Sequence, residues 1–121
     1  MNKRVVGDFF EKLACSYIED QGGIILERNF RALRGEVDII AKDSKYLCFI
    51  EVKYRTGDRF GDATEAVNIR KQKQICKISN LYLISKYKSL ELPIRYDVIA
   101  ISSIDNAVTI KWLKNAFGYI T

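Results

Sequence analysis

The sequence predicts an α/β fold in which helices flank a small mixed sheet of five strands. Three observations predict it. An amphipathic helical pattern opens the chain, a strand-like run at residues 46–53 is apolar on both faces, and a longer helical pattern separates that run from two further strand-like segments. A strand that is apolar on both faces is normally central in its sheet and covered on both sides.

The first half of the chain is expected to form one helix followed by three strands. Residues 3–20 are predicted to be helical because apolar side chains recur at three- and four-residue steps, and two consecutive glycines end the pattern. The expected strands are residues 24–30, 37–41 and 46–53. Residues 31–35 form the first expected turn, with Gly35 as its tight point, and residues 42–45 form a hairpin loop.

The second half is expected to place a long helix before two more strands. The expected elements are a loop at residues 56–62, a helix from Ala63 to about Lys88, and strands at residues 95–101 and 108–113 joined by a turn at Asp105-Asn106. Short loops let the first three strands pair as a meander, whereas the long helix crosses the sheet and allows a parallel pairing of the fourth strand. Residues 1–121 are expected to form a single domain.

The amino-acid composition limits the catalytic mechanisms that are open to the chain. The chain carries a net charge of +5 and has no histidine. Without histidine there is no Ser-His or Cys-His nucleophile pair, so any hydrolysis must rest on carboxylates, lysine, tyrosine or a metal ion. Cys15, Cys48 and Cys76 lie in apolar runs and are expected to be buried, reduced thiols, which favours the cytoplasm. No run approaches the roughly 18 apolar residues of a membrane span, so no membrane association is expected.

The most informative segment is Gly35-Glu36-Val37-Asp38, followed after twelve residues by Glu51-Val52-Lys53. Side chains two residues apart in a strand share a face, so Glu51 and Lys53 point to the same side of the most apolar strand. Asp38 lies on the preceding strand, roughly 4.8 Å away. Carboxylates on adjacent strands can hold Mg²⁺ or Mn²⁺ between them, and Lys53 can stabilise the charge that develops on a phosphate.

Two alternatives stay open for these acids. Asp38 or Glu51 could simply form an ion pair with Lys53 at the rim of the sheet. Glu11, on the first helix, lies beside the apolar stripe with small residues around it, so another element can approach it closely. Glu11 is therefore either a further residue of the site or an ordinary solvated helix charge.

Five motifs run along nearly the whole chain: Gly7-x-x-x-Glu11-x-x-Ala14, Arg28-Asn29-Phe30-Arg31, Gly35-Glu36-Val37-Asp38-Ile39-Ile40-Ala41, Phe49-Ile50-Glu51-Val52-Lys53-x-Arg55 and Arg95-Tyr96-Asp97-Val98. Together they resemble the YraN-like family of small bacterial predicted endonucleases, in the PD-(D/E)XK, or restriction-endonuclease-like, superfamily. The fold that this resemblance implies is a restriction-endonuclease-like core, a mixed sheet flanked by helices.

The resemblance also implies a cofactor and residue roles. In the superfamily the aspartate and the glutamate bind Mg²⁺ and the lysine assists the attacking water, which carries over to Asp38, Glu51 and Lys53. Val52, between the glutamate and the lysine, is counted with the two acids among the metal-binding positions. In resolvase-like members a glutamate on the first helix joins the site, which corresponds to Glu11.

Basic residues favour a nucleic acid partner. Residues 70–90 contain six basic residues and no acid, and a helix face with that many cations can follow a phosphate backbone, although a solvated face is the commoner use. The candidate nucleic-acid-binding residues are Arg55, Arg59, Lys71, Lys73 and Lys77. DNA is the expected partner, with RNA and a homodimer left open.

The predicted function is a Mg²⁺-dependent endonuclease that hydrolyses DNA phosphodiester bonds, with a resolvase-like preference for branched structures as one form of it. One alternative is a nucleic-acid-binding module that leaves cleavage to a partner. Another is an assembly subunit with a relict site. The retained carboxylates argue against a purely binding role, because they would repel phosphate.

Overall fold

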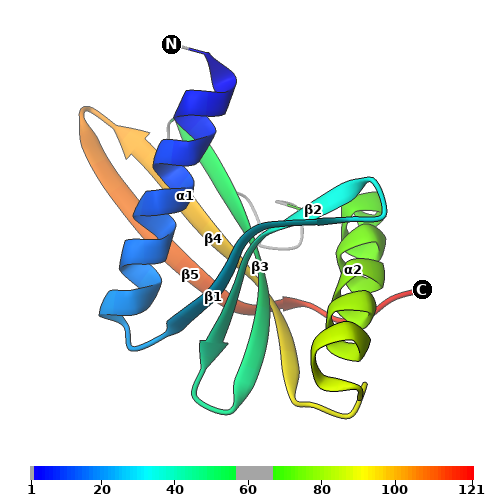
Figure 1. The fold of residues 1–121 in the computed structure, drawn as a ribbon. Helices are drawn as coiled ribbons and strands as arrows, with labels where there is room; N and C mark the ends of the chain where they lie inside the picture. The colour runs from blue at the N-terminus through cyan, green and yellow to red at the C-terminus, as the bar shows by residue number, and fades with distance from the viewer. Residues whose placement is uncertain (1, 57–66) are drawn as a thin grey trace.

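The computed structural model describes residues 2–56 and 67–121 and contains the predicted helices and strands (Figure 1). The elements in chain order are α1 (Lys3–Asp20), β1 (Ile24–Ala32), β2 (Gly35–Asp43), β3 (Tyr46–Thr56), α2 (Ile69–Tyr87), β4 (Ile94–Ile104) and β5 (Ala107–Phe117). The five strands form one sheet in the order β1-β2-β3-β4-β5. The β3–β4 pair is parallel and its neighbours are antiparallel, which confirms the predicted meander, crossover and mixed sheet.

The helices cover opposite faces of the sheet (Figure 1). On one face, Phe49 of β3 joins the core under α2. On the other face, Cys48 and Ile50 of the same strand join the core under α1. The three side chains have no exposed surface, which confirms that β3 is central and apolar on both faces.

Two expectations from the sequence concern the burial of the cysteines and the presence of membrane-spanning helices. Cys15, Cys48 and Cys76 are all buried and free, as predicted for reduced thiols that pack as small apolar side chains. Within residues 2–56 and 67–121, neither helix is long and apolar enough to cross a membrane.

The second helix was predicted to begin at Ala63, but the described residues Val67 and Asn68 are not helical, so this prediction is wrong there. Asn68 has an extended backbone, and its side-chain Oδ1 accepts a hydrogen bond from the Lys71 backbone N at 2.9 Å. This is an N-cap, which satisfies a first-turn N–H and starts α2 at Ile69. The predicted loop at residues 56–62 and the helix residues 63–66 lie almost wholly outside the described part of the chain.

The tight point of the first turn is not Gly35. Leu33 and Arg34 occupy the turn with positive φ angles of 52° and 60°, and Gly35 is the first residue of β2. A side chain at Gly35 would overlap the side chain of Gln74 on α2. Gly35 thus lies against the flexible end of the Gln74 side chain, and the turn itself is made by two residues that rarely adopt its conformation.

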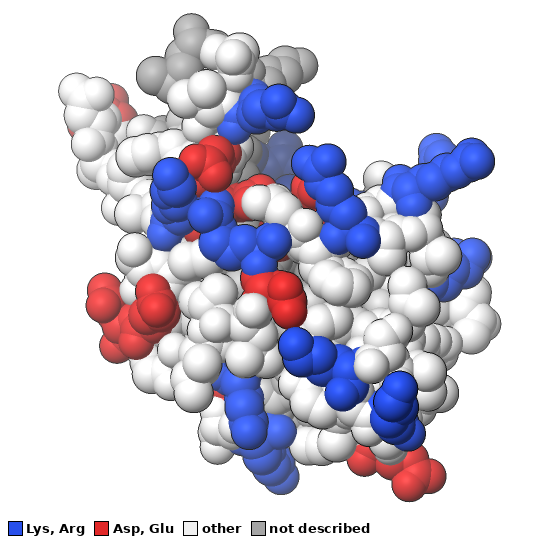
Figure 2. Space-filling model, in the orientation of Figure 1, with Lys and Arg blue, Asp and Glu red and all other residues white. Residues whose placement is uncertain are grey.

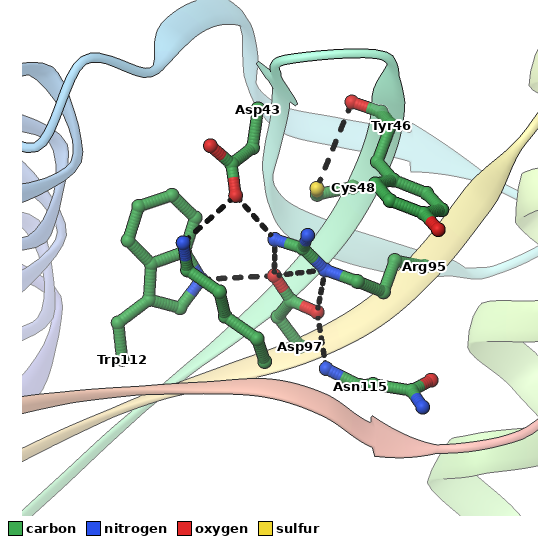
Figure 3. A network of polar contacts seen from close by, with 8 residues as sticks. Asp43, Tyr46, Cys48, Arg95, Asp97, Trp112 and Asn115 are labelled. Atoms are coloured by element: carbon green, nitrogen blue, oxygen red, sulfur yellow. Dashed lines mark hydrogen bonds and ion pairs between the residues drawn. The ribbon is translucent and has the colours of Figure 1, made fainter.

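A buried polar network fastens β4 to β5 (Figure 3). The Asp97 carboxylate has no exposed surface and accepts hydrogen bonds from Arg95, from Trp112 Nε1 at 2.8 Å and from the Asn115 backbone N at 2.8 Å. Asn115 has a φ of 55° and lies where the register of the two strands shifts. Asp97 thus supplies the acceptor that the irregular strand pairing leaves missing.

Candidate functional site

The candidate site lies where β2 and β3 separate. Their backbone pairing stops at Ile39 and Ile50, whereas β3 goes on pairing with β4. Beyond this point the Asp38 side chain replaces the missing backbone partner of β3. Its Oδ2 accepts a hydrogen bond from the Val52 backbone N at 2.8 Å. A backbone N–H away from water needs a partner, so this bond closes the break in the sheet and fixes the Asp38 carboxylate between the strands.

The side chain of Glu51 is buried beside Asp38, with Lys71 as its nearest cation. It is 5% exposed and follows Phe49 on the α2 side of β3. Lys71 Nζ lies 3.6 Å from Glu51 Oε2, and that oxygen has no hydrogen-bond partner among the described residues. Burial, and next the hydrogen bond to Asp38 and the repulsion between the two carboxylates, raise the pKa of Glu51 to about 9. In the metal-free protein burial and the Asp38 charge therefore favour the protonated form of Glu51.

Val52 and Lys53 continue β3 past this pair. The Val52 side chain packs into the core under α1, while its backbone N–H is bound by Asp38. Lys53 is half-buried, two residues after Glu51 on the same strand. Within the described residues it forms no ion pair, so the simple bridge from Lys53 to an acid is not what the structure holds.

A second group of acids shares Asp38. One carboxylate oxygen from each of Glu11, Glu36 and Asp38 lies within 4.8 Å of the other two. Burial, and next the charge of Asp38, raise the pKa of Glu11 to about 7, although Arg28 Nη2 lies 3.6 Å from Glu11 Oε1. Glu11 is thus a largely buried neighbour of Asp38 and not a solvated helix charge.

Glu36 and Lys71 were not expected at this place. Glu36 precedes Asp38 by two residues in β2, and this spacing, which places two side chains on one face of a strand, is the signal that could have found it. Lys71 was expected on the outer face of its helix. It lies instead between Glu51 and the Glu36 carbonyl O, which is 3.4 Å from its Nζ. Lys71 precedes the buried Ile75 by four residues, so the helical stripe does include it.

The other basic candidates are spread around the acids. Lys73 and Lys77 are exposed and line a hollow of about 470 Å³ beside α2. Arg55 is exposed near the end of β3, and Arg59 lies outside the described residues. Figure 2 shows Lys and Arg side chains gathered around partly hidden carboxylates on the upper part of the face it presents. The surface can therefore attract an anion to a region that itself holds negative groups.

The donor set fits a divalent cation. Hard cations such as Mg²⁺ and Mn²⁺ prefer carboxylate oxygens, and Asp38 and Glu51 supply two that are already close together. Glu51 Oε2 lacks a hydrogen-bond partner among the described residues, and the raised pKa of Glu51 shows that a positive neighbour would relieve the site. Glu11 and Glu36 offer further carboxylate oxygens near Asp38.

Comparison with known proteins places this site in a family. Residues 10–101 match the model of a family described as Uncharacterised protein family UPF0102. The chain belongs to the UPF0102 family. The match includes all the acids of the candidate site and confirms the family membership predicted from the motifs. The family description names no activity.

Relatives within the UPF0102 family cover nearly the full chain. A UPF0102 protein of Clostridium botulinum (strain 657 / Type Ba4) is 46% identical over 114 residues, which are 93% of each chain. A UPF0102 protein of Clostridium kluyveri is 42% identical over the same length and the same shares. These relatives are named for the family alone.

Proposed function

We propose that this UPF0102 protein is a divalent-metal-dependent nuclease that hydrolyses phosphodiester bonds of DNA. The observation that carries the proposal is the Asp38–Glu51 pair, two buried carboxylates held side by side where β2 and β3 separate. Burying two such groups without a cation is unfavourable. A fold that nevertheless keeps them, with basic side chains around them, is suited to hold a metal ion against a phosphate.

In this proposal the acidic residues bind the metal ion, and Lys53 stabilises negative charge on the phosphate. Asp38 and Glu51 would hold Mg²⁺ or Mn²⁺, with Glu11 and Glu36 close enough to Asp38 to assist. The bound ion would supply Lewis acidity by polarising a phosphoryl oxygen. Lys53 would donate hydrogen bonds to the charge that develops on the phosphate. Glu11, with a pKa of about 7, would exchange a proton near neutral pH.

A cleavage assay tests the proposal. The purified protein is incubated with linear, flapped and four-way DNA and with RNA, in Mg²⁺, in Mn²⁺ or in EDTA. We expect cleavage of DNA in either metal, none in EDTA, and a loss of at least about 10²-fold in Glu51→Gln. The exposed Glu91→Gln is the matched control. Binding of DNA without cleavage in either metal would reject the nuclease and favour a binding module.

A further inference from the structure

The tip of the β1–β2 hairpin uses residues that its conformation disfavours. Leu33 and Arg34 both have positive φ angles, 52° and 60°, as a two-residue turn of type I′ requires. Such turns prefer Asn, Asp or Gly, because other side chains crowd the backbone there. The β4–β5 hairpin makes its turn with Asp105 and Asn106, at 49° and 66°. Folding alone therefore gives no reason for Leu33 and Arg34, and their side chains need another use.

The same tip forms one wall of a groove against α2. Leu33 and Ile69 are each 59% exposed and line a hollow of about 470 Å³ together with Gln74 and three cations of α2. The hairpin meets the helix at this place, where Gly35 lies against the Gln74 side chain. The apolar pair is thus exposed to solvent where the hairpin and the helix meet.

This groove leads to the candidate site. Leu33 and Gln74 also line an adjoining hollow of about 630 Å³, whose wall includes Lys71 and Glu36. Glu36 belongs to the acidic group around Asp38. The basic side chains that line the two hollows are Arg31, Arg34, Arg70, Lys71, Lys73 and Lys77. A row of phosphates in the groove would meet cations along its length and the acids where the metal ion would lie.

We propose that these two hollows, here called the hairpin groove, bind a nucleic acid strand with unstacked bases, its phosphates on the cations and its bases on Leu33 and Ile69. This inference rests on the nuclease function proposed above and specifies its substrate. Contact with a phosphate does not stabilise a leucine side chain, whereas burial against an apolar surface such as the face of a base does. The faces of bases in an intact duplex are covered by their neighbours, so gapped, flapped or single-stranded DNA is the substrate that fits.

Binding measurements on turn variants test the inference. The full chain is titrated, in EDTA, onto a fluorescent DNA duplex and onto the same duplex with a gap of a few nucleotides. Leu33→Asn suits the turn better and should raise the melting temperature. It should also weaken binding to gapped DNA about tenfold, the equivalent of losing one buried leucine side chain, and leave duplex binding within about twofold. Asn106→Gly, in the β4–β5 turn, is the matched control and should change neither affinity.

Three results would overturn the inference. The first is unchanged binding of gapped DNA by Leu33→Asn, and the second is an equal loss on gapped and intact DNA. The third is displacement of the gapped DNA by polyglutamate at equal charge concentration, which would mean that the groove binds any acidic chain. The wild-type cleavage assay separates this failure from that of the nuclease: cleavage with unchanged variant binding rejects the hairpin groove alone.

Discussion

At the scale of single residues, Glu51 shows why the site suits a cation. Its carboxyl is buried beside Asp38, and the pKa of about 9 means that folding favours its protonated form. Lys71, 3.6 Å away, does not bring that pKa back to its ordinary range. A divalent ion carries twice the charge of a lysine and binds directly to carboxylate oxygens, so it is the better partner.

The metal-free protein should be less stable at high pH because of Glu51. Its pKa is about 9 when folded and near 4.5 when unfolded, so between these values the folded state holds one more proton. The free energy of unfolding should then fall by about 1.4 kcal/mol per pH unit over that window from this group alone. Glu51→Gln should flatten the decline and be the more stable protein at pH 8. Urea unfolding in EDTA measures both, and a Glu51→Gln curve parallel to that of Glu91→Gln would contradict the argument.

Lys53 should matter for catalysis and not for metal binding. It lies two residues after Glu51 on β3, on the same side of the strand, so its ammonium group would face a phosphate held at the metal ion. Lys53→Met is expected to slow single-turnover cleavage about 10²- to 10³-fold while Mn²⁺ affinity stays within about threefold. Lys111→Met, an exposed change on β5, should leave both unchanged. Full cleavage by Lys53→Met would exclude the assigned role.

At the scale of elements, the β4–β5 network keeps the sheet in register. Arg95 joins Asp97 to Asp43 at the end of β2, with Nη2 at 2.9 Å from Asp43 Oδ2. The network therefore ties β2, β4 and β5 together on the α1 side of the sheet (Figure 3). The hydrogen bonds that Asp97 accepts from Arg95, Trp112 Nε1 and the Asn115 N–H stabilise the pairing of β4 with β5.

Removing the Asp97 carboxylate should be strongly destabilising. Asp97→Ala leaves the Arg95 guanidinium, Trp112 Nε1 and a backbone N–H short of their shared acceptor. The expected loss in free energy of unfolding is about 3–5 kcal/mol, the usual effect of breaking a buried charge pair. Thr109→Ala, exposed on β5, should change it by less than about 0.5 kcal/mol. A loss below about 1 kcal/mol in Asp97→Ala would show that the network is dispensable.

The first half of α2 should contribute to DNA affinity through charge. Lys73 and Lys77 are exposed along one side of the helix, so replacing both with Ala should weaken binding to all DNA sequences about equally. The slope of log affinity against log salt should flatten by about one unit for each phosphate that a lysine no longer neutralises. Lys86→Ala with Lys111→Ala removes equal charge elsewhere as the control. Identical slopes in both double variants would exclude this side of α2 as the DNA-binding surface.

At the scale of the whole molecule, patterns within one strand or helix predicted most of the fold. The run at residues 46–53 indicated a central strand because apolar side chains on both faces have one common explanation, and the Asp105-Asn106 turn followed from residues that tolerate positive φ. The Leu33-Arg34 turn could not be predicted in this way, because its residues disfavour the conformation they adopt.

The site was predictable only in part for a related reason. Strand parity placed Glu51 and Lys53 on one side of β3, and the same parity in β2 is the signal for Glu36 beside Asp38. The convergence of Glu11 on Asp38 depends on how α1 packs across the sheet, and the approach of Lys71 to Glu51 depends on where α2 crosses β3. Such distances between elements are set by packing, which periodicity does not record.

Titration calorimetry with Mn²⁺ tests the central claim, that Asp38 and Glu51 form a divalent-cation site, most directly. Near pH 7 the wild type should bind one ion at this pair and release about one proton, because Glu51 must lose its proton to become a ligand. Asp38→Asn and Glu51→Gln should each weaken binding at least about tenfold, and Glu51→Gln should also abolish the proton release. Glu91→Gln should match the wild type. Unchanged Mn²⁺ affinity in both site variants would contradict the claim.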